Sequence, residues 1–322
     1  MKYIDEVVIA VKDGVRLGLI ASLVIFTILA VYSLLLIVIP ASFDAVFGDA
    51  VMKETAYTIH TNYSAVEFPL AVLGWEQAYF LNPYTENKIP EPGSLDAWAR
   101  TFSFVKINGS YHIFIRDAPV SWKIKYRLAN CGEYAQIFAY IMNKIGYRAR
   151  VVTAPAEDHM WAEYYNGSQK IVVETSGDFI INSTKDFANG RNWSYIVSLN
   201  PSNVSDSVDV SDEYIERANL TVKVYDSENN SDIQITVLSP YLMQADPSRY
   251  SVPNAVLSNS TDQDGIARFK LGPKAYIIQA RKSFWIASLL LSKNVTVFLG
   301  KENELVFDFN KDRGEWKFLN NQ

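Results

Sequence analysis

Cysteine and histidine are both scarce in this chain of 322 residues, which contains one cysteine, Cys131, and three histidines. A single cysteine excludes any intramolecular disulfide, and nearly half of the residues are hydrophobic, which is enough for two or three domains. The net charge of −5 comes without a basic block, which argues against nucleic acid as a partner. Internal repeats and nucleotide, flavin or haem motifs are also missing, so we expect no cofactor.

Charge is absent from one long stretch, residues 17–39, whose sequence is LGLIASLVIFTILAVYSLLLIVI. As a helix it would be roughly 35 Å long, which is enough to cross the hydrocarbon core of a bilayer. The apolar region of a secretory signal is shorter and is followed by a small-residue cleavage site, whereas Pro40 ends this stretch without one. We therefore expect residues 1–16 to be a short lead and residues 17–39 to be a single uncleaved transmembrane anchor in contact with membrane lipid.

The flanking charges predict the orientation of this anchor. Lys2, Lys12 and Arg16 precede it, while Asp44 and Asp49 follow it. The positive-inside rule then places the N-terminus in the cytoplasm and the bulk of the chain outside the cell. Ten N-x-S/T sequons agree, because all of them follow the anchor and are candidate glycosylation sites. They begin at Asn62, Asn108, Asn166, Asn182, Asn192, Asn203, Asn219, Asn229, Asn259 and Asn294.

The residues with the most distinctive chemistry lie between Asn130 and Asp178. A helical apolar pattern begins at Cys131 and ends before Gly146, a natural residue for the end of a helix. Three strands are predicted next, at residues 148–153, 159–165 and 171–175, the last two joined by an Asn-Gly hairpin turn. This order places Cys131 at a helix N-terminus and His159 at the start of a strand.

That placement suits a thiol nucleophile. The positive end of a helix favours the thiolate, and a neighbouring histidine can hold the thiolate as an ion pair and later protonate a leaving amine. A carboxylate beyond the histidine would fix its tautomer. Glu174, on the strand that returns from His159, is the first choice for this role, and Asp178 is the alternative.

These blocks resemble the catalytic core of the transglutaminase-like superfamily, a papain-like thiol-enzyme fold. That family combines a Cys at a helix start, a G-x-x-A-R strand, an H-x-W-x-E strand and an acidic residue on the next strand. The corresponding segments here are Cys131-Gly-Glu-Tyr-Ala, Gly146-Tyr-Arg-Ala-Arg150, His159-Met-Trp-Ala-Glu163 and Val173-Glu174-Thr175. The sequences Asn-Cys-Gly-Glu-Tyr-Ala and Asp-His-Met-Trp-Ala-Glu-Tyr-Tyr are most similar to those of the peptide N-glycanase branch.

The resemblance implies an enzyme that acts on amide bonds of a protein, peptide or glycopeptide, either as a protease or amidase or as a protein-crosslinking acyltransferase. An upstream tryptophan often serves the oxyanion hole in this family, and Trp98 and Trp122 are the candidates. The chain departs from the family at Glu174, where Asp is usual, and at Lys170, where Trp is usual. It also has no paired cysteines to hold the zinc of the N-glycanase branch, and we expect no metal.

Each of these residues also has a structural interpretation. A lone cysteine is most often a small buried hydrophobe, and a histidine near a tryptophan is often a core residue. Trp161 and Glu163 suit packing and a strand surface, and His60 and His112 have no partners in the pattern. The alternative function is therefore a non-catalytic surface protein that uses a degenerate core and a β-sandwich for binding or adhesion.

The remaining pattern gives an α+β architecture. We expect a connector at residues 40–59, the transglutaminase-like domain at 60–199, a polar linker at 200–215, a β-sandwich at 216–310 and a tail at 311–322. Helices are expected at 42–59 and 64–80 and from Ser94, with a strand at 111–116. Six alternating runs predict the sandwich: Leu220–Tyr225, Ile233–Leu238, Ala267–Leu271, Ala275–Ala280, Asn294–Leu299 and Glu304–Phe309.

The phrase Thr261-Asp-Gln-Asp-Gly265, followed by Gly272-Pro-Lys-Ala-Tyr276, resembles carboxypeptidase-regulatory or transthyretin-like domains. Asp262 and Asp264 have side chains that calcium accepts, but a single D-x-D-G is more typical of a hairpin turn. We expect this domain to be a spacer or a binding module.

Overall fold

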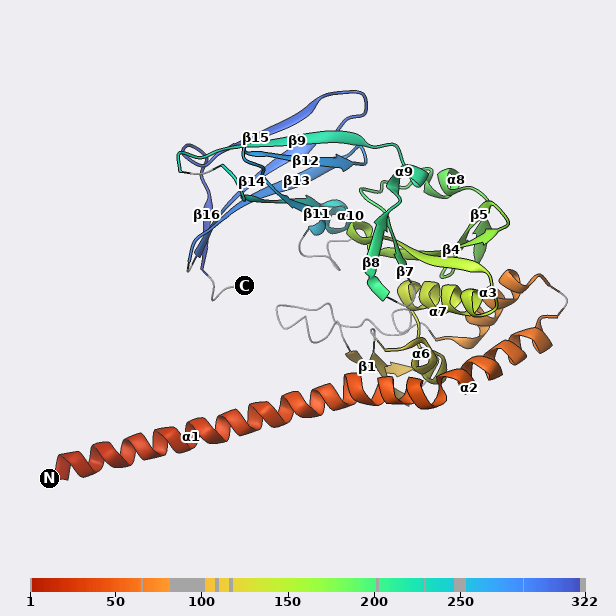
Figure 1. Ribbon diagram of the computed structural model, residues 1–322, viewed down its shortest axis with the longest axis horizontal. Helices are drawn as coiled ribbons and strands as arrows, with labels where there is room; N and C mark the ends of the chain where they lie inside the picture. Colours follow the sequence, from red (N-terminus) through yellow and green to blue (C-terminus); the bar gives the residue numbers. More distant parts are fainter. Residues whose placement is uncertain are drawn as a thin grey trace. The chain divides into compact units, whose positions relative to one another are not determined.

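The computed structural model describes residues 2–64, 66–81, 102–107, 110–115, 118–200, 203–228, 230–245, 253–285 and 287–318. The chain divides into two compact units (Figure 1). The first combines Met1–Asn62 with Phe80–Ala129, and the second combines Tyr63–Tyr79 with Asn130–Gln322. The helix expected from Ser94 lies outside the described residues.

Long helices dominate the first unit. Helix α1 (Lys2–Ser33) continues through a π-helical turn, η1 (Leu34–Val38), into α2 (Ile39–Asn62), which confirms the helix expected at 42–59. Strands β1 (Phe102–Ile107) and β2 (Ser110–Ile115) form an antiparallel hairpin, of which only β2 was predicted. The short helix α6 (Val120–Tyr126) packs on α2.

Residues 15–62 form the one helical stretch, among the described residues, that is long and apolar enough to cross a membrane. Its most hydrophobic window has a mean hydropathy of 2.8, and none of that window is buried. Leu17 and Phe26, for example, are 68% and 70% exposed. A surface of this kind is unfavourable in water and needs an apolar environment or a partner.

The second unit begins with α3 (Phe68–Tyr79) and α7 (Cys131–Lys144) and continues into a six-stranded antiparallel sheet of order β6-β5-β4-β3-β7-β8. Helix α7 packs on β3 and β4 (Figure 1). The strands are β3 (Arg148–Ala154), β4 (His159–Asn166), β5 (Gln169–Glu174), β6 (Phe179–Ile181), β7 (Val197–Asn200) and β8 (Asn203–Asp209). The predicted order of helix and three strands is confirmed.

A cluster of large side chains fills one side of this sheet. Trp161, Phe187, Trp193 and Tyr214 are all at most 5% exposed, and they pack together with Val152, Val172 and Ile196. Phe187 belongs to α8 (Thr184–Ala188) and Tyr214 to α9 (Ser211–Tyr214). The expectation of a linker at 200–215 was wrong, because this segment forms β8 and α9 and contributes to the core of the sheet.

The C-terminal part of the unit forms two sheets around a separate core. One has the order β11-β10-β13-β14-β16 and the other β12-β9-β15 (Figure 1). Alternation along β9 buries Leu220, Val222 and Val224 against the opposite sheet. The strands are β9 (Ala218–Tyr225), β10 (Gln234–Ser239), β11 (Asn254–Ser260), β12 (Ile266–Leu271), β13 (Ala275–Ser283), β14 (Ala287–Thr296), β15 (Asn303–Asp308) and β16 (Glu315–Phe318).

Three details of the sandwich differ from the prediction. Strand β11 was not expected, β14 begins seven residues before the predicted Asn294 and ends at Thr296, and β16 lies in the segment expected to be a tail. The D-x-D-G phrase is a turn, as expected: Asp262 Oδ1 accepts the backbone N–H groups of Asp264 and Ile266, at 3.0 and 2.9 Å. Gly265 has a φ of +75°, a conformation that favours glycine.

Candidate active site

Cys131 is the first residue of α7, directly after the N-cap Asn130. The side-chain oxygen of Asn130 accepts the backbone N–H groups of Gly132 and Glu133, and the Glu133 carboxylate accepts the N–H of Asn130, at 3.1 Å. This reciprocal capping box fixes the first turn of the helix and does not use the backbone N–H of Cys131. The thiol is free and half-buried, at the positive end of the helix.

The hairpin of β4 and β5 brings a histidine and a carboxylate together. His159 begins β4 and Glu174 ends β5, and their Nε2 and Oε2 atoms are 2.7 Å apart. Glu174 is only 4% exposed. Its other oxygen accepts the Ser176 hydroxyl at 2.8 Å, and an Arg191 guanidinium nitrogen lies 3.7 Å from Oε2. The carboxylate is therefore oriented on several sides.

His159 also interacts electrostatically with Cys131. Glu174 occupies Nε2 of the imidazole. Burial on its own lowers the pKa of His159, but its interactions with Cys131 and Glu174 outweigh burial and raise the pKa to about 9. Burial raises the pKa of Glu174, yet its hydrogen bond and ion pair with His159 lower it overall. Both groups are thus charged at neutral pH.

Aromatic packing supports the imidazole. The Trp161 ring lies 5.8 Å from the His159 ring at an interplanar angle of 27°, and Trp193 stacks on Trp161 at 4.7 Å and 7°. The indole N–H of Trp161 donates to the Tyr214 hydroxyl at 2.9 Å. Trp161 is therefore a packing residue, as expected, and it links His159 to the aromatic core.

The other predicted residues differ in their surroundings and in whether the structure describes them. Asp178 is exposed, in the turn before β6, with a φ of +55°. Trp122 belongs to the first unit, where its ring packs edge-on against Phe43 at 5.6 Å. Trp98 lies outside the described residues. Glu163, expected on a strand surface, is instead fully buried and bound by Arg150 at 2.5 Å and by the Tyr214 hydroxyl.

Three contributors to the site were missed at the sequence level: Ser176, Arg191 and Trp193. Ser176 has a weak local signal, since it follows Glu174 by two residues. Arg191 and Trp193 come from the loop after α8, and no periodic pattern connects that loop with β5. The guanidinium of Arg191 lies 4.4 Å from the Phe187 ring, so packing holds it beside Glu174.

Seven sequon asparagines have described side chains, and all seven are exposed: Asn62, Asn166, Asn182, Asn192, Asn219, Asn259 and Asn294. The side chain of Asn203 is not described. Asn108 and Asn229 lie outside the described residues. His60 is exposed at the end of α2, and His112 lies on β2.

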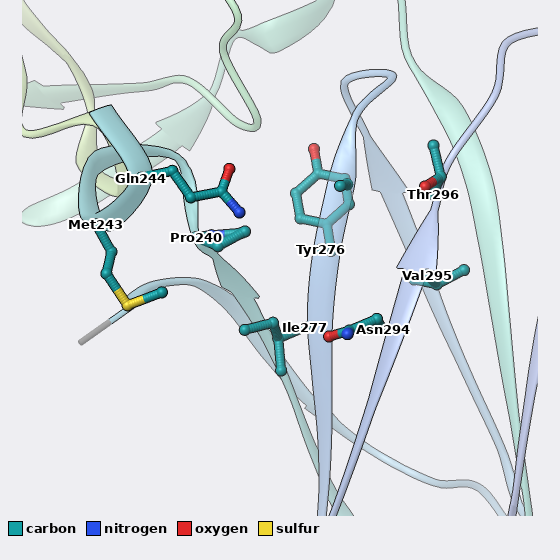
Figure 2. A pocket seen from close by; sticks show the side chains of 9 residues that line it. Pro240, Met243, Gln244, Tyr276, Ile277, Asn294, Val295 and Thr296 are labelled. Atoms are coloured by element: carbon teal, nitrogen blue, oxygen red, sulfur yellow. The ribbon is translucent and has the colours of Figure 1, made fainter. Parts of the chain in front are cut away.

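A pocket of about 310 Å³ lies on the sandwich and not at the Cys131 site. Figure 2 shows it between α10 (Tyr241–Ala245) and the strands β13 and β14. Its lining residues are Pro240, Met243, Gln244, Ala275, Tyr276, Ile277, Asn294, Val295 and Thr296. No titratable pair lines it, so its chemistry differs from that of the Cys131 site.

Residues 84–175 match the model of the transglutaminase-like superfamily, so the chain contains a transglutaminase-like domain. Two curated peptide-N(4)-(N-acetyl-beta-glucosaminyl)asparagine amidases are similar. The protein from Yarrowia lipolytica is 29% identical over 136 residues, which are 41% of this chain and 37% of the relative. The protein from Kluyveromyces lactis is 30% identical over 128 residues, which are 37% of this chain and 33% of the relative.

The chain thus spans about a third of the length of these relatives. Among solved structures, the shaft pilin SpaA from Lactobacillus rhamnosus GG has 10% identity and a TM-score of 0.24, covering 29% of this chain and 46% of the pilin. The Bacillus anthracis TIE protein has 11% identity and a TM-score of 0.20, covering 50% of this chain and 30% of that protein. The domain and its curated relatives together support amidase or transglutaminase-like chemistry.

Proposed function

We propose that this protein is a membrane-anchored thiol enzyme that cleaves or exchanges amide bonds outside the cell. The observation that carries the proposal is the 2.7 Å contact between His159 and Glu174, together with the electrostatic interaction between His159 and Cys131 at a capped helix N-terminus within the transglutaminase-like domain. In this proposal Cys131 is the nucleophile, His159 the base and acid, and Glu174 the group that orients His159.

The proposed reaction begins from a Cys131 thiolate beside a His159 imidazolium. The Cys131 thiolate attacks the amide carbonyl carbon, and a C–S bond forms while the oxygen gains charge. The capping box does not use the backbone N–H of Cys131. This N–H and a second donor would stabilise the oxygen. The C–N bond then breaks as the His159 imidazolium gives its proton to the leaving amine. Water or a lysine amine next attacks the thioester, His159 takes the proton, and the thiolate leaves.

Glu174 supports both halves of this cycle. Its carboxylate holds the ring through Nε2, and its charge stabilises the imidazolium. Glutamate is one methylene longer than the aspartate usual in the family, and the 2.7 Å contact is consistent with the same orienting role. Because Asp178 is exposed in a turn, Glu174 is the stronger assignment.

The substrate class comes from the curated relatives. Their names specify an amide bond between a glycan and asparagine, which makes a glycopeptide amide the first substrate to test. Hydrolysis of a plain peptide amide and transfer to a lysine amine are the other outcomes. The exposed apolar helix, the flanking charges and the exposed sequons support the anchor, the outward orientation and glycosylation.

The first experiment is the pH dependence of Cys131 alkylation by iodoacetamide on the full chain in mild detergent. As the protein has one cysteine, the reaction reports that site alone. We expect fast alkylation already at about pH 6, because a thiolate reacts and a thiol does not. His159→Ala should remove this fast phase, whereas His60→Ala should preserve it. Alkylation that is slow near neutral pH and indifferent to His159→Ala would favour the binding or adhesion function instead.

If Cys131 is reactive in the alkylation experiment, the wild-type protein is then screened for substrates. Deglycosylation of a denatured glycoprotein, cleavage of a peptide library and incorporation of a fluorescent amine into casein separate the three reactions. Cys131→Ala is the control in each assay.

A further inference from the structure

A turn of the C-terminal sandwich reaches the segment that leads into His159. The 3-10 turn η2 (Pro155–Glu157) joins β3 to β4, and only Asp158 separates Glu157 from His159. Ala156, in the middle of η2, is completely buried and belongs to the hydrophobic core of the sandwich. The backbone just before His159 is therefore packed into the C-terminal domain.

A buried ion pair fastens this contact. Glu157 Oε1 accepts from Lys274 Nζ at 2.6 Å and from the Ser194 hydroxyl at 2.5 Å. The two charged side chains are only 3% and 5% exposed. Lys274 also donates to the carbonyl of Asn192 at 2.8 Å. Since Glu157 Oε2 has no hydrogen-bond partner among the described residues, Lys274 provides the compensating charge for this carboxylate.

The sandwich turn that contains Lys274, residues 272–274, also contacts Trp193 and Ser194. Gly272 donates its backbone N–H to the Ser194 carbonyl at 2.9 Å, and a Cβ at position 272 would lie 2.1 Å from the Trp193 carbonyl oxygen. Trp193 stacks on Trp161, which in turn lies against His159. Residues 272–274 thus reach His159 by two routes, one through Glu157 and one through the stacked indoles.

We propose that the turn formed by residues 272–274 is a positioning element for the candidate active site, with Lys274 as a positioning residue that holds η2 and thereby the His159 ring between Cys131 and Glu174. The sandwich is then a part of the catalytic architecture and not a detachable spacer. The effect on catalysis rests on the proposed function. The position of the His159 ring does not depend on that function.

The test compares two broken ion pairs of the same sandwich in the full chain. Lys274→Met removes the partner of Glu157. Lys282→Met is the matched control, because Lys282 contacts Asp226 at 2.5 Å and Glu228 at 2.7 Å, away from η2. The two readouts are the pH profile of Cys131 alkylation and the NMR titration of His159, which is one of three histidines and is assignable with His60→Asn and His112→Asn variants.

We expect Lys274→Met to slow alkylation near neutral pH by on the order of tenfold or more, since small displacements of a reacting pair have effects of this size. The His159 titration should move toward its ordinary value of 6.5, while Lys282→Met leaves both readouts unchanged. Ser194→Ala, a milder change that removes one hydrogen bond from Glu157, should shift the titration in the same direction and covers the case in which Lys274→Met does not fold.

The proposal is overturned if folded Lys274→Met, or Ser194→Ala in its place, keeps the wild-type titration of His159. It is also overturned if Lys282→Met changes the titration as much. Failure of the proposed function has a different signature: wild-type Cys131 would then react slowly and without dependence on His159. The His159 titration in the variants still decides the positioning claim in that case.

Discussion

His159 carries the largest electrostatic consequence of any single residue at the site. Its pKa rises from 6.5 to about 9, although its side chain is largely buried. A shift of this size corresponds to roughly 3 kcal/mol, shared between the contacts with Glu174 and Cys131. Since the folded-state pKa lies above the unfolded one, this stabilisation is fully present below about pH 6.5 and is lost as the pH rises through about 9.

We therefore predict that Glu174→Gln flattens the pH dependence of stability between pH 6.5 and 9. The wild-type protein should lose free energy of unfolding across this interval, and the variant should lose less, because the amide cannot stabilise the imidazolium by charge. Thermal unfolding at a series of pH values, followed by near-ultraviolet circular dichroism, measures the effect. Ser176→Ala, which keeps the carboxylate and removes one hydrogen bond, should give an intermediate curve.

A parallel wild-type and Glu174→Gln curve would show that the ion pair does not form in solution. Glu174 itself has the opposite dependence, because its pKa is lowered: its contribution is present above its ordinary value of 4.5 and is lost as the pH falls further. The pair therefore stabilises the fold most between about pH 4.5 and 6.5.

At the scale of elements, the capped start of α7 connects stability with reactivity. Asn130→Ala removes the acceptor of two backbone N–H groups and breaks the capping box, which typically costs about 1 kcal/mol. We predict that it also slows Cys131 alkylation near neutral pH, since the first turn carries the thiol. Ser183→Ala, at the N-cap of α8, should destabilise by a similar amount and leave alkylation unchanged.

Denaturation midpoints and alkylation rates of the two variants decide this prediction. Equal reactivity of the Asn130→Ala variant and the wild-type protein would mean that the cap stabilises α7 without positioning Cys131. Asn130→Asp keeps an acceptor for the same N–H groups and should retain most of the stability.

The elements that the sequence predicted best are those with one buried face. The period of α7, its end at Gly146 with a φ of +94° and the alternation of β9 all reflect contact with a core. Strands β1, β6, β7, β8, β11 and β16, by contrast, were missed, and all of them except β7 lie at the edge of a sheet. Along β11 only Val256 is buried, so its sequence lacks an alternating pattern, whereas the edge strand β12 alternates and was predicted.

The candidate site was predictable only in part, because some of its contacts join residues close in sequence and others join distant ones. Cys131, His159 and Glu174 lie on α7, β4 and β5 within a short stretch of sequence, and the β4–β5 hairpin brings His159 and Glu174 together. Glu157 and Lys274 are 117 residues apart, and no local pattern connects them. Contacts of this kind depend on how whole domains pack, which one-dimensional periodicity does not describe.

The whole molecule combines two features that require different environments. Residues 17–39 expose large apolar side chains along a helix, while the sequon asparagines that can be placed are exposed to water. Transferring a fully exposed leucine or phenylalanine side chain from water to an apolar phase is worth about 1.5–3 kcal/mol. This gain supports the proposed membrane anchor, and the charges at the two ends of the helix support the proposed orientation.

The single cysteine makes this orientation measurable. We predict that a membrane-impermeant maleimide labels Cys131 in intact cells, because the proposed topology places residues after the anchor outside. In a Cys131→Ala background, Asp13→Cys should be labelled only after the membrane is permeabilised, since Asp13 precedes the anchor. Labelling of Asp13→Cys, but not Cys131, in intact cells would reverse the topology and with it the extracellular location of the candidate active site.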